Sequence, residues 1–197
     1  MKKVGVLISG RGSNLGALIE AQAGAPYKII LVISNIDDAG GLQRARDAGI
    51  ATRAIPHQGK SREAFDAELD TALRGAGVDI VCLAGFMRIL SDGFARAGEG
   101  RLVNIHPSLL PAYKGTKVHE RVLAGGESFS GASVHFVVPE LDAGPVIAQA
   151  AVPVHPADTP EILAARVLAA EHKLYPAALR LLAEDKVKLE KGLAVFS

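Results

Sequence analysis

The chain has 197 residues, of which 49% are hydrophobic and 22% charged, and this composition excludes a disordered protein and favours one folded domain. The 22 Lys and Arg residues nearly balance 21 Asp and Glu residues, so the net charge of +1 disfavours nucleic acid and anionic membranes as partners. The single cysteine, Cys82, excludes an internal disulfide and indicates a reducing, cytoplasmic location. The sequence contains no uninterrupted run of the ~18 apolar residues that a membrane span requires.

Short apolar runs alternate with helical patterns through the first half of the chain. This alternation is typical of βαβ units, whose parallel strands form a sheet with helices on both faces. The expected strands are Val4–Ile8, Ile29–Ile33, Thr52–Ile55, Ile80–Leu83 and Arg101–Ile105, and the expected helices are Ser13–Ala23, Gly41–Ala48 and Ser61–Arg74.

The second half begins with two strand patterns that lie close together. Along Gly131–Val138, successive side chains alternate between two faces in the pattern of a strand. The run Pro145–Val152 follows after a Gly-Pro turn signal. Because a short loop joins them, we expect these strands to pair antiparallel. The sequence therefore predicts an α/β fold with a mixed sheet, parallel in its N-terminal half and antiparallel in its C-terminal half.

A long helix is expected after Thr159, whose side chain can cap it, with Pro160 at the first helical position. Pro176 is expected to kink this helix, because proline lacks an N–H group and crowds the preceding turn. Val187–Leu189 is expected to form a last edge strand. Since no repeat or linker interrupts the pattern, we interpret residues 1–197 as a single domain.

The segment from Ser9 to Asn14 joins the first strand directly to the first helix, and its glycines would let the backbone approach an anion. Free N–H groups at a helix N-terminus favour a phosphate, and Ser13 and Asn14 add side-chain donors. Leu15 stands where a dinucleotide fingerprint has its third glycine, and the loop lacks the Lys of a nucleoside-triphosphate loop. We therefore predict a site for a monophosphate ester, with a ligand-free turn as the alternative.

Asn104 and His106 lie two residues apart on an expected strand, so their side chains leave the same face of the sheet. An amide and a protonated imidazole side by side can both donate to one developing oxyanion. Asp142, in a polar loop between two apolar strands, is the candidate carboxylate that would favour the charged ring. The alternatives are a structural histidine at a strand end and an aspartate that serves a turn.

The sequence indicates neither a metal site nor a covalent nucleophile. The other histidines lack the spacing of metal ligands, and no serine lies in an elbow motif. The residues therefore favour chemistry without a covalent intermediate. The histidines are His57, His119, His135, His155 and His172, and the serines are Ser9, Ser13 and Ser108.

Several long motifs, in this order along nearly the whole chain, resemble those of the glycinamide ribonucleotide formyltransferases, folate-dependent enzymes of purine synthesis. The resemblance implies a Rossmann-like formyltransferase fold. It also implies direct attack of the nucleotide's amine on the formyl group of 10-formyltetrahydrofolate. The motifs are Ile8–Asn14, Ser61–Glu63, Leu83–Leu90, Asn104–Pro111, Gly131–Val137 and Glu171-His172.

The resemblance also implies a role for each residue that matches a family motif. Residues 1–100 would form the half that binds the nucleotide phosphate, and residues 101–197 the folate-binding and catalytic half. The implied catalytic set is Asn104, His106 and Asp142; the phosphoribosyl site is Gly12, Ser13, Asn14 and Glu171; and the folate site is Arg62, Met87, Arg88, Ile89, Leu90, Asn104, Val138, Glu140, Leu141 and Asp142.

One segment departs from the family pattern, since Leu168–Ala170 stand where relatives often carry polar residues near the nucleotide. Three alternatives stay open. The first is a formyltetrahydrofolate hydrolase, or a formyltransferase that acts on methionyl-tRNA or an amino sugar. The second is a nicotinamide-dependent oxidoreductase, and the third is a nucleotide-binding module without activity. Small-molecule substrates are the expected partners, without a metal, and a homodimer is left open.

Overall fold

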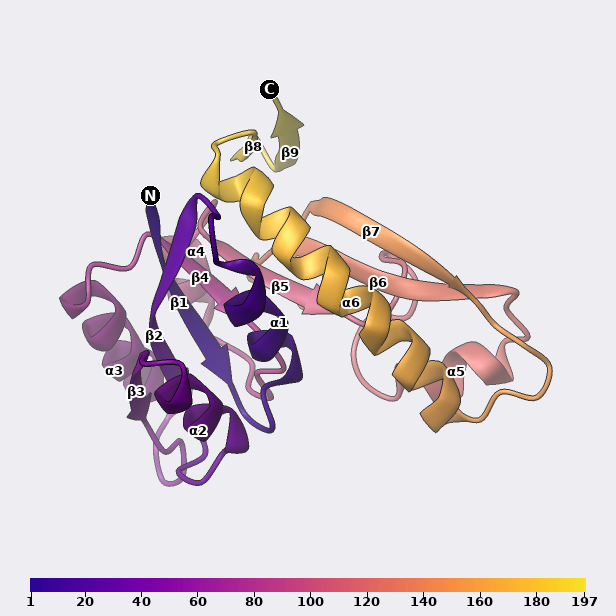
Figure 1. Cartoon of the computed structure of the whole chain (residues 1–197), viewed down its shortest axis with the longest axis horizontal. Coiled ribbons are helices and arrows are strands. Elements are labelled where there is room, and N and C mark those ends of the chain that lie inside the picture. Colours follow the sequence, from indigo (N-terminus) through magenta and orange to yellow (C-terminus); the bar gives the residue numbers. More distant parts are fainter.

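A computed structural model describes residues 1–197, and a mixed seven-stranded sheet runs through it in the order β3-β2-β1-β4-β5-β6-β7 (Figure 1). The first five strands in that order pair parallel, and β6 and β7 complete the sheet as antiparallel neighbours. The predicted mixed sheet is therefore confirmed. The strands are β1 (Lys2–Ile8), β2 (Tyr27–Ser34), β3 (Ala51–Ala54), β4 (Ile80–Leu83), β5 (Leu102–His106), β6 (Phe129–Phe136) and β7 (Val146–Pro153).

Helices cover both faces of the sheet, as expected, and each face has its own hydrophobic core. The larger core lies under α1, α2, α5 and α6, and the smaller one lies under α3 and α4. Successive residues of β1 alternate between these cores, which is the period of two of a strand buried on both sides. The helices are α1 (Ser13–Ala21), α2 (Gly40–Asp47), α3 (Arg62–Gly75), α4 (Asp92–Ala97), α5 (Val118–Ala124) and α6 (Pro160–Ala183).

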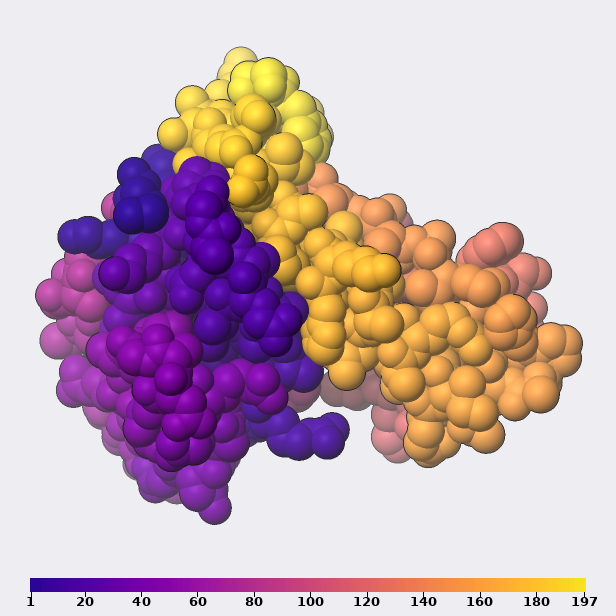
Figure 2. All heavy atoms as spheres, viewed as in Figure 1, coloured from indigo at the N-terminus to yellow at the C-terminus, as the bar shows by residue number.

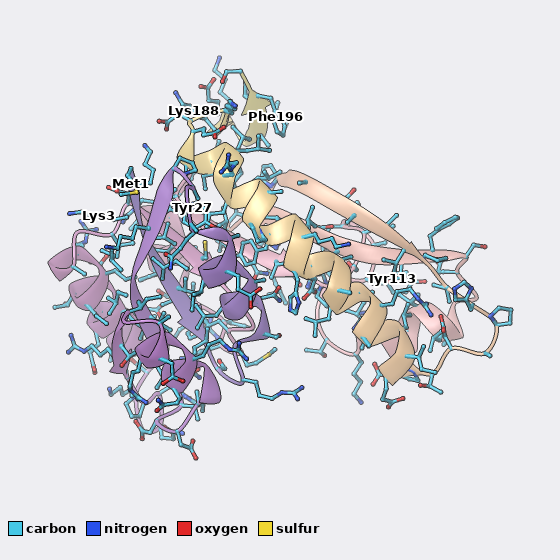
Figure 3. All side chains as sticks on the ribbon, viewed as in Figure 1. Met1, Lys3, Tyr27, Tyr113, Lys188 and Phe196 are labelled. Carbon is cyan, nitrogen blue, oxygen red and sulfur yellow. The ribbon has the colours of Figure 1, made fainter.

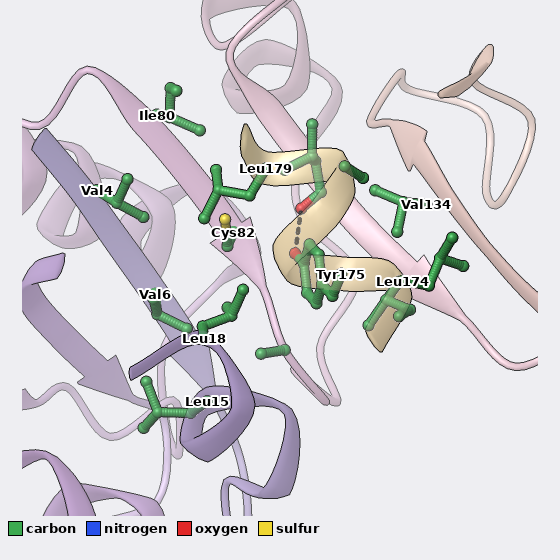
Figure 4. Close-up of a cluster of buried hydrophobic side chains, with 14 of the residues drawn as sticks. Val4, Val6, Leu15, Leu18, Ile80, Cys82, Val134, Leu174, Tyr175 and Leu179 are labelled. Carbon is green, nitrogen blue, oxygen red and sulfur yellow. Dashed lines mark hydrogen bonds between the residues drawn. The ribbon is translucent and has the colours of Figure 1, made fainter. Parts of the chain in front are cut away.

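The helix α6 lies across the larger core and packs against α1, β6 and β7 (Figure 1). Thr159 caps it as predicted, with its hydroxyl accepting from Ile162 N–H at 3.3 Å. The helix continues without a break through Pro176, and a bend there stays a prediction. Tyr175 inserts among the core side chains (Figure 4), and its hydroxyl donates to the Leu83 carbonyl at 2.9 Å. This buried anchor sets the position of α6 relative to β4.

Elements that the sequence analysis missed are short or peripheral. They are the one- to two-turn helices α4 and α5 and the second strand of a C-terminal hairpin, which pairs β8 (Val187–Glu190) with β9 (Leu193–Phe196). Lys188 and Phe196 mark this hairpin, which projects beyond the end of α6 (Figure 3). The strand expected at 131–138 ends at Phe136, because the next residues turn into the loop before β7. No helix is both long and apolar enough to cross a membrane.

The order of the strands places a crevice at one edge of the sheet. From β3 at one border the chain crosses to β4, on the other side of β1, so the connections after β1 and β4 leave in opposite directions. Open α/β sheets bind ligands at such a switch point, outside the carboxyl ends of the strands. The loops after β1, β4 and β5 therefore meet at this edge, and they carry most of the predicted site residues.

Candidate active site

The loop after β1 has the geometry of an anion site. Gly12 has a φ of 71° and stands at the N-cap of α1, without a side-chain cap. A Cβ atom at Gly12 would lie 2.8 Å from the Cα of Gly41, so this close approach requires glycine. Along α1, Gly16 is the first residue whose backbone N–H has a hydrogen-bond partner, and it donates to the Gly12 carbonyl at 2.9 Å. The three preceding N–H groups are thus free to bind an anion.

An open pocket of about 450 Å³ adjoins this loop. Its one cationic side chain of fixed charge is Arg44 on α2, which has no ion pair and no hydrogen bond within the protein. The Arg44 guanidinium lies so close over Gly16 that a Cβ atom there would be 2.8 Å from Nη1. Arg44 was not predictable from the sequence, since nothing along the chain places α2 beside α1. The lining residues are Ser13, Gly16, Ala17, Glu20, Ala21, Arg44 and His172.

The predicted ribose ligand Glu171 lies beside the phosphate loop. Its Oε2 accepts a hydrogen bond of 2.8 Å from Asn14 Nδ2, and both side chains are buried. Burial raises the pKa of the Glu171 carboxyl, and the hydrogen bond from Asn14 opposes this shift. The structure thus brings together two members of the predicted phosphoribosyl site that lie far apart in the sequence.

The three predicted catalytic residues meet at the carboxyl end of β5. His106 Nδ1 lies 3.4 Å from Asp142 Oδ2, and the Asp142 loop closes over the strand end. Asp142 itself is 9% exposed and has a φ of 49°, a left-handed conformation that aspartate tolerates better than most residues. The N–H of Gly115 donates to Asp142 Oδ2 at 2.9 Å. The carboxylate is therefore held by its backbone conformation and by a neighbouring loop.

The Asp142 loop returns to the sheet through Gly144. A Cβ atom at Gly144 would lie 1.7 Å from the Phe136 carbonyl oxygen, so no other residue fits without moving the backbone. Pro145 follows, and its carbonyl accepts from Phe136 N–H at 3.0 Å. This contact sets where the loop starts and ends, and hence where Asp142 points.

The two ring nitrogens of His106 face different groups. Nε2 lies 2.9 Å from the Tyr113 carbonyl, while Nδ1 faces Asp142. A ring that donated from both nitrogens would have to carry both protons, as the charged form expected from the sequence does. The contact with Tyr113 adds a requirement for catalysis. An Nε2–H that donates to the Tyr113 carbonyl would have to leave it before donating to a substrate oxygen.

His135 joins this cluster, although the sequence analysis assigned it no role. Burial lowers the pKa of His135, which favours the neutral ring, and its Nδ1 lies 2.8 Å from the Phe136 carbonyl. With the proton on Nδ1, Nε2 accepts from Asn104 Nδ2 at 3.2 Å. His135 thereby sets which way the Asn104 amide points. The only available signal was its place on the same strand face as Ser133, because the pairing of β5 with β6 is not local.

The predicted folate residues after β4 lie in a segment outside any helix or strand, beyond the carboxyl end of that strand. Met87 is 78% exposed and Ile89 52%, whereas Leu90 is buried in the smaller core. The Arg88 guanidinium lies 4.7 Å from the centre of the Phe65 ring, and its Nε is buried without a partner. Exposed apolar side chains beside free polar groups suit a flat heterocycle.

The other predicted folate residues are more loosely placed. Arg62 begins α3 exposed and unpaired, and Glu140 meets Lys114 at the surface with an N–O distance of 3.4 Å. Leu141 is 51% exposed, and Val138 is half-buried. No hydrogen bond or ion pair joins the Arg62 side chain to the Asp142 loop. The surface is hollowed between the N-terminal half and the β6–β7 side, below α6 (Figure 2). No group of three or more His, Cys, Asp and Glu side chains could hold a metal ion.

Residues 2–179 match the model of the formyl transferase family. The chain belongs to this family. The phosphoribosylglycinamide formyltransferase of Escherichia coli is 48% identical over 192 residues, which are 96% of this chain and 91% of that protein. The trifunctional purine biosynthetic protein adenosine-3 of Bos taurus is 51% identical over 190 residues, 95% of this chain. The chain spans only 19% of that trifunctional protein.

Solved structures of formyl transferases share this fold. The glycinamide ribonucleotide transformylase 1 of Symbiobacterium toebii has a TM-score of 0.96 and 44% identity, covering 100% of this chain and 94% of that one. A formyltetrahydrofolate deformylase from Pseudomonas syringae has a TM-score of 0.92 at 28% identity and covers 99% of this chain and 65% of its own. Solved structures similar to this chain are therefore named both for formyl transfer and for deformylation.

Proposed function

We propose that this protein transfers the formyl group of 10-formyltetrahydrofolate to the amine of glycinamide ribonucleotide, in purine biosynthesis. The observation that supports the proposal is that three predicted site segments lie at the same edge of the sheet. The phosphate loop after β1, the segment after β4 and the Asn104–His106 pair on β5 all stand at the carboxyl ends of adjacent parallel strands. Relatives that align with nearly their whole length bear the name of this activity.

Each substrate draws residues from both halves of the chain. The nucleotide's phosphate binds the N–H groups of Gly12, Ser13 and Asn14, and its ribose hydroxyls donate to Glu171. The folate lies along Met87–Leu90, with Arg62 near its carboxylates and the segment from Val138 to Asp142, including Glu140 and Leu141, over its ring. The hydrogen bond between Asn14 and Glu171 supports this sharing of residues, because it joins residues 1–100 to residues 101–197.

The reaction proceeds by direct attack. The amine nitrogen of the nucleotide forms a bond to the formyl carbon, and the electron pair of the C=O bond moves onto oxygen. Asn104 Nδ2 and the charged His106 ring donate to this oxyanion, and Asp142 keeps the ring charged and oriented. The C–N bond to the folate then breaks. A proton passes from the attacking amine to the leaving nitrogen, through a water held by Asp142.

Location and assembly complete the proposal. Both substrates are small molecules of central metabolism, and a single buried cysteine suits a reducing cytoplasm. A homodimer is the proposed assembly, which sedimentation at two protein concentrations would test. A single species of monomer mass at both concentrations would contradict it.

A spectroscopic formyl-transfer assay tests the activity. Purified protein is mixed with 10-formyltetrahydrofolate, with and without glycinamide ribonucleotide, while the deformylated folate is followed. Release that depends on the nucleotide is expected. Equal release without the nucleotide would identify a hydrolase, which the likeness to the Pseudomonas syringae deformylase makes the leading alternative. Folate binding without release would point to another acceptor, and stabilisation by nicotinamide nucleotides alone would point to an oxidoreductase.

A further inference from the structure

The backbone of residues 88–90 is unusual for a chain segment so close to the core. None of the N–H and C=O groups of Arg88, Ile89 and Leu90 has a hydrogen-bond partner within the protein. The segment belongs to no helix or strand, so it has no ladder to hold its shape. Side-chain packing holds part of it, since Leu90 lies in the smaller core and Arg88 over Phe65, but its backbone needs further contacts, because a segment without hydrogen bonds would otherwise sample many conformations.

Ser9 holds the first end of this segment. Its hydroxyl accepts from Met87 N–H at 2.7 Å, and its own N–H donates to the Gly85 carbonyl at 3.2 Å. The hydroxyl proton is directed elsewhere, because Ser9 Oγ donates to Asn35 Oδ1 at 2.6 Å. Asn35 is in turn oriented by His57, whose Nδ1 lies 3.1 Å from Asn35 Nδ2. The lone pair of Ser9 thus points at Met87.

Asp66 holds the second end. This residue lies on α3, is 3% exposed, and accepts from Ser91 N–H at 2.6 Å through Oδ2. Ser91 is also the N-cap of α4, with its hydroxyl accepting from Phe94 N–H. Neither Ser9 nor Asp66 reaches the middle of the segment. Two side-chain acceptors therefore fix its ends and leave its central polar groups free.

We propose that Ser9 and Asp66 are positioning residues that preset residues 88–90 to pair with the polar edge of the folate heterocycle. This inference rests on the proposed function, because the ligand is its co-substrate. A segment fixed beforehand loses less conformational freedom on binding, so the two acceptors should act on affinity for the folate. They should act little on the chemical step, since neither lies in the cluster of Asn104, His106 and Asp142.

The test compares Ser9→Ala and Asp66→Ala with the conservative variants Ser9→Thr and Asp66→Asn, which keep an acceptor in place. Loss of one such hydrogen bond should raise the KM for 10-formyltetrahydrofolate about five- to tenfold. The dissociation constant for tetrahydrofolate, measured by calorimetry, should rise equally. The KM for the nucleotide and kcat should stay within about twofold, and the conservative variants should restore most of the folate affinity.

Thr159→Ala is the matched control, because it also removes a hydroxyl that accepts a backbone N–H, at the distant start of α6. It should lower the thermal midpoint without changing the KM for either substrate. Unchanged folate affinity in the alanine variants would overturn the proposal. An equal rise of both KM values would also overturn it, since the two acceptors would then merely support the whole edge of the sheet.

The calorimetric measurement of tetrahydrofolate binding distinguishes a failure of this inference from a failure of the proposed function. If the wild-type protein bound tetrahydrofolate but did not formylate the nucleotide, the proposed function would fail. The calorimetric comparison of Ser9 and Asp66 variants would still decide the positioning role. Where Asp66→Ala does not fold, the Ser9→Ala and Ser9→Thr pair decides the proposal, since unchanged folate affinity in Ser9→Ala would overturn it.

Discussion

Asn14 and Glu171 are separated by 157 residues in the sequence, yet Asn14 Nδ2 donates to Glu171 Oε2 at 2.8 Å. Asn14 belongs to the first turn of α1, and Glu171 lies one turn before the buried anchor Tyr175 of α6. The contact therefore fixes the distance between the proposed phosphate site and the proposed ribose site. A nucleotide that fits both proposed sites would be held between α1 and α6, which pack against each other.

Glu171→Gln should weaken nucleotide binding. The carboxylate can accept from two ribose hydroxyls, and hydrogen bonds to a charged acceptor contribute about 1.5–3 kcal/mol, so KM for the nucleotide should rise about tenfold or more. The KM for the folate should stay near its wild-type value. Steady-state kinetics with each substrate varied in turn would check this, and an unchanged nucleotide KM would contradict the assignment.

The same variant should change the dependence of stability on pH. Burial raises the pKa of Glu171 above its ordinary value of 4.5, so the folded protein binds this proton more tightly than the unfolded chain does. The free energy of unfolding should therefore fall as pH rises from about 4.5 through the raised pKa. Glu171→Gln should lack this loss and be the more stable protein at neutral pH. Urea unfolding across this pH range would measure it.

Arg44→Ala should also raise the KM for the nucleotide, by about tenfold, because the phosphate loop has no other arginine or lysine beside it in the adjoining pocket. The wild-type KM should rise with ionic strength, and the variant should show a smaller rise. Arg46→Ala is the control on the same helix, since Arg46 hydrogen-bonds to Gln43 and does not line the pocket. Equal effects of the two substitutions would argue against a local role for Arg44.

His106→Ala and Asp142→Asn should each lower kcat by about 10²–10³-fold, the usual cost of losing one donor to an oxyanion. The first substitution removes the donor, and the second removes the charge that orients it 3.4 Å away. Both KM values should change little. Single-turnover measurements would isolate the chemical step, and turnover within tenfold of the wild type in either variant would contradict the proposed roles.

His135→Ala should lower kcat about tenfold through Asn104, because the amide would lose the acceptor that orients it at 3.2 Å. The effect should not add to that of Asn104→Ala, so the double variant should be no slower than Asn104→Ala alone. His155→Ala, in an exposed loop, is the control and should leave kcat unchanged. Additive losses would show that His135 acts independently of Asn104.

Much of the fold was predictable because its signals are local. The alternation of apolar runs and helical patterns placed the strands β1 to β5 and the helices α1 to α3 close to their observed bounds. The cap at Thr159 and the helix that follows it were equally local. The short helices α4 and α5 were missed, since a helix of six or seven residues carries too little periodicity to stand out.

The candidate site likewise has features that local sequence predicts and features that depend on tertiary contacts. Spacing alone placed Asn104 and His106 on one face of a strand, and the glycines alone indicated an anion loop at Gly12. The tertiary structure decided what these residues meet. It brought His135 to Asn104 and Arg44 to the phosphate loop, although both pairs are distant in sequence. Local propensity follows from a few neighbouring residues, whereas these contacts depend on strand order and helix packing, which only the folded chain determines.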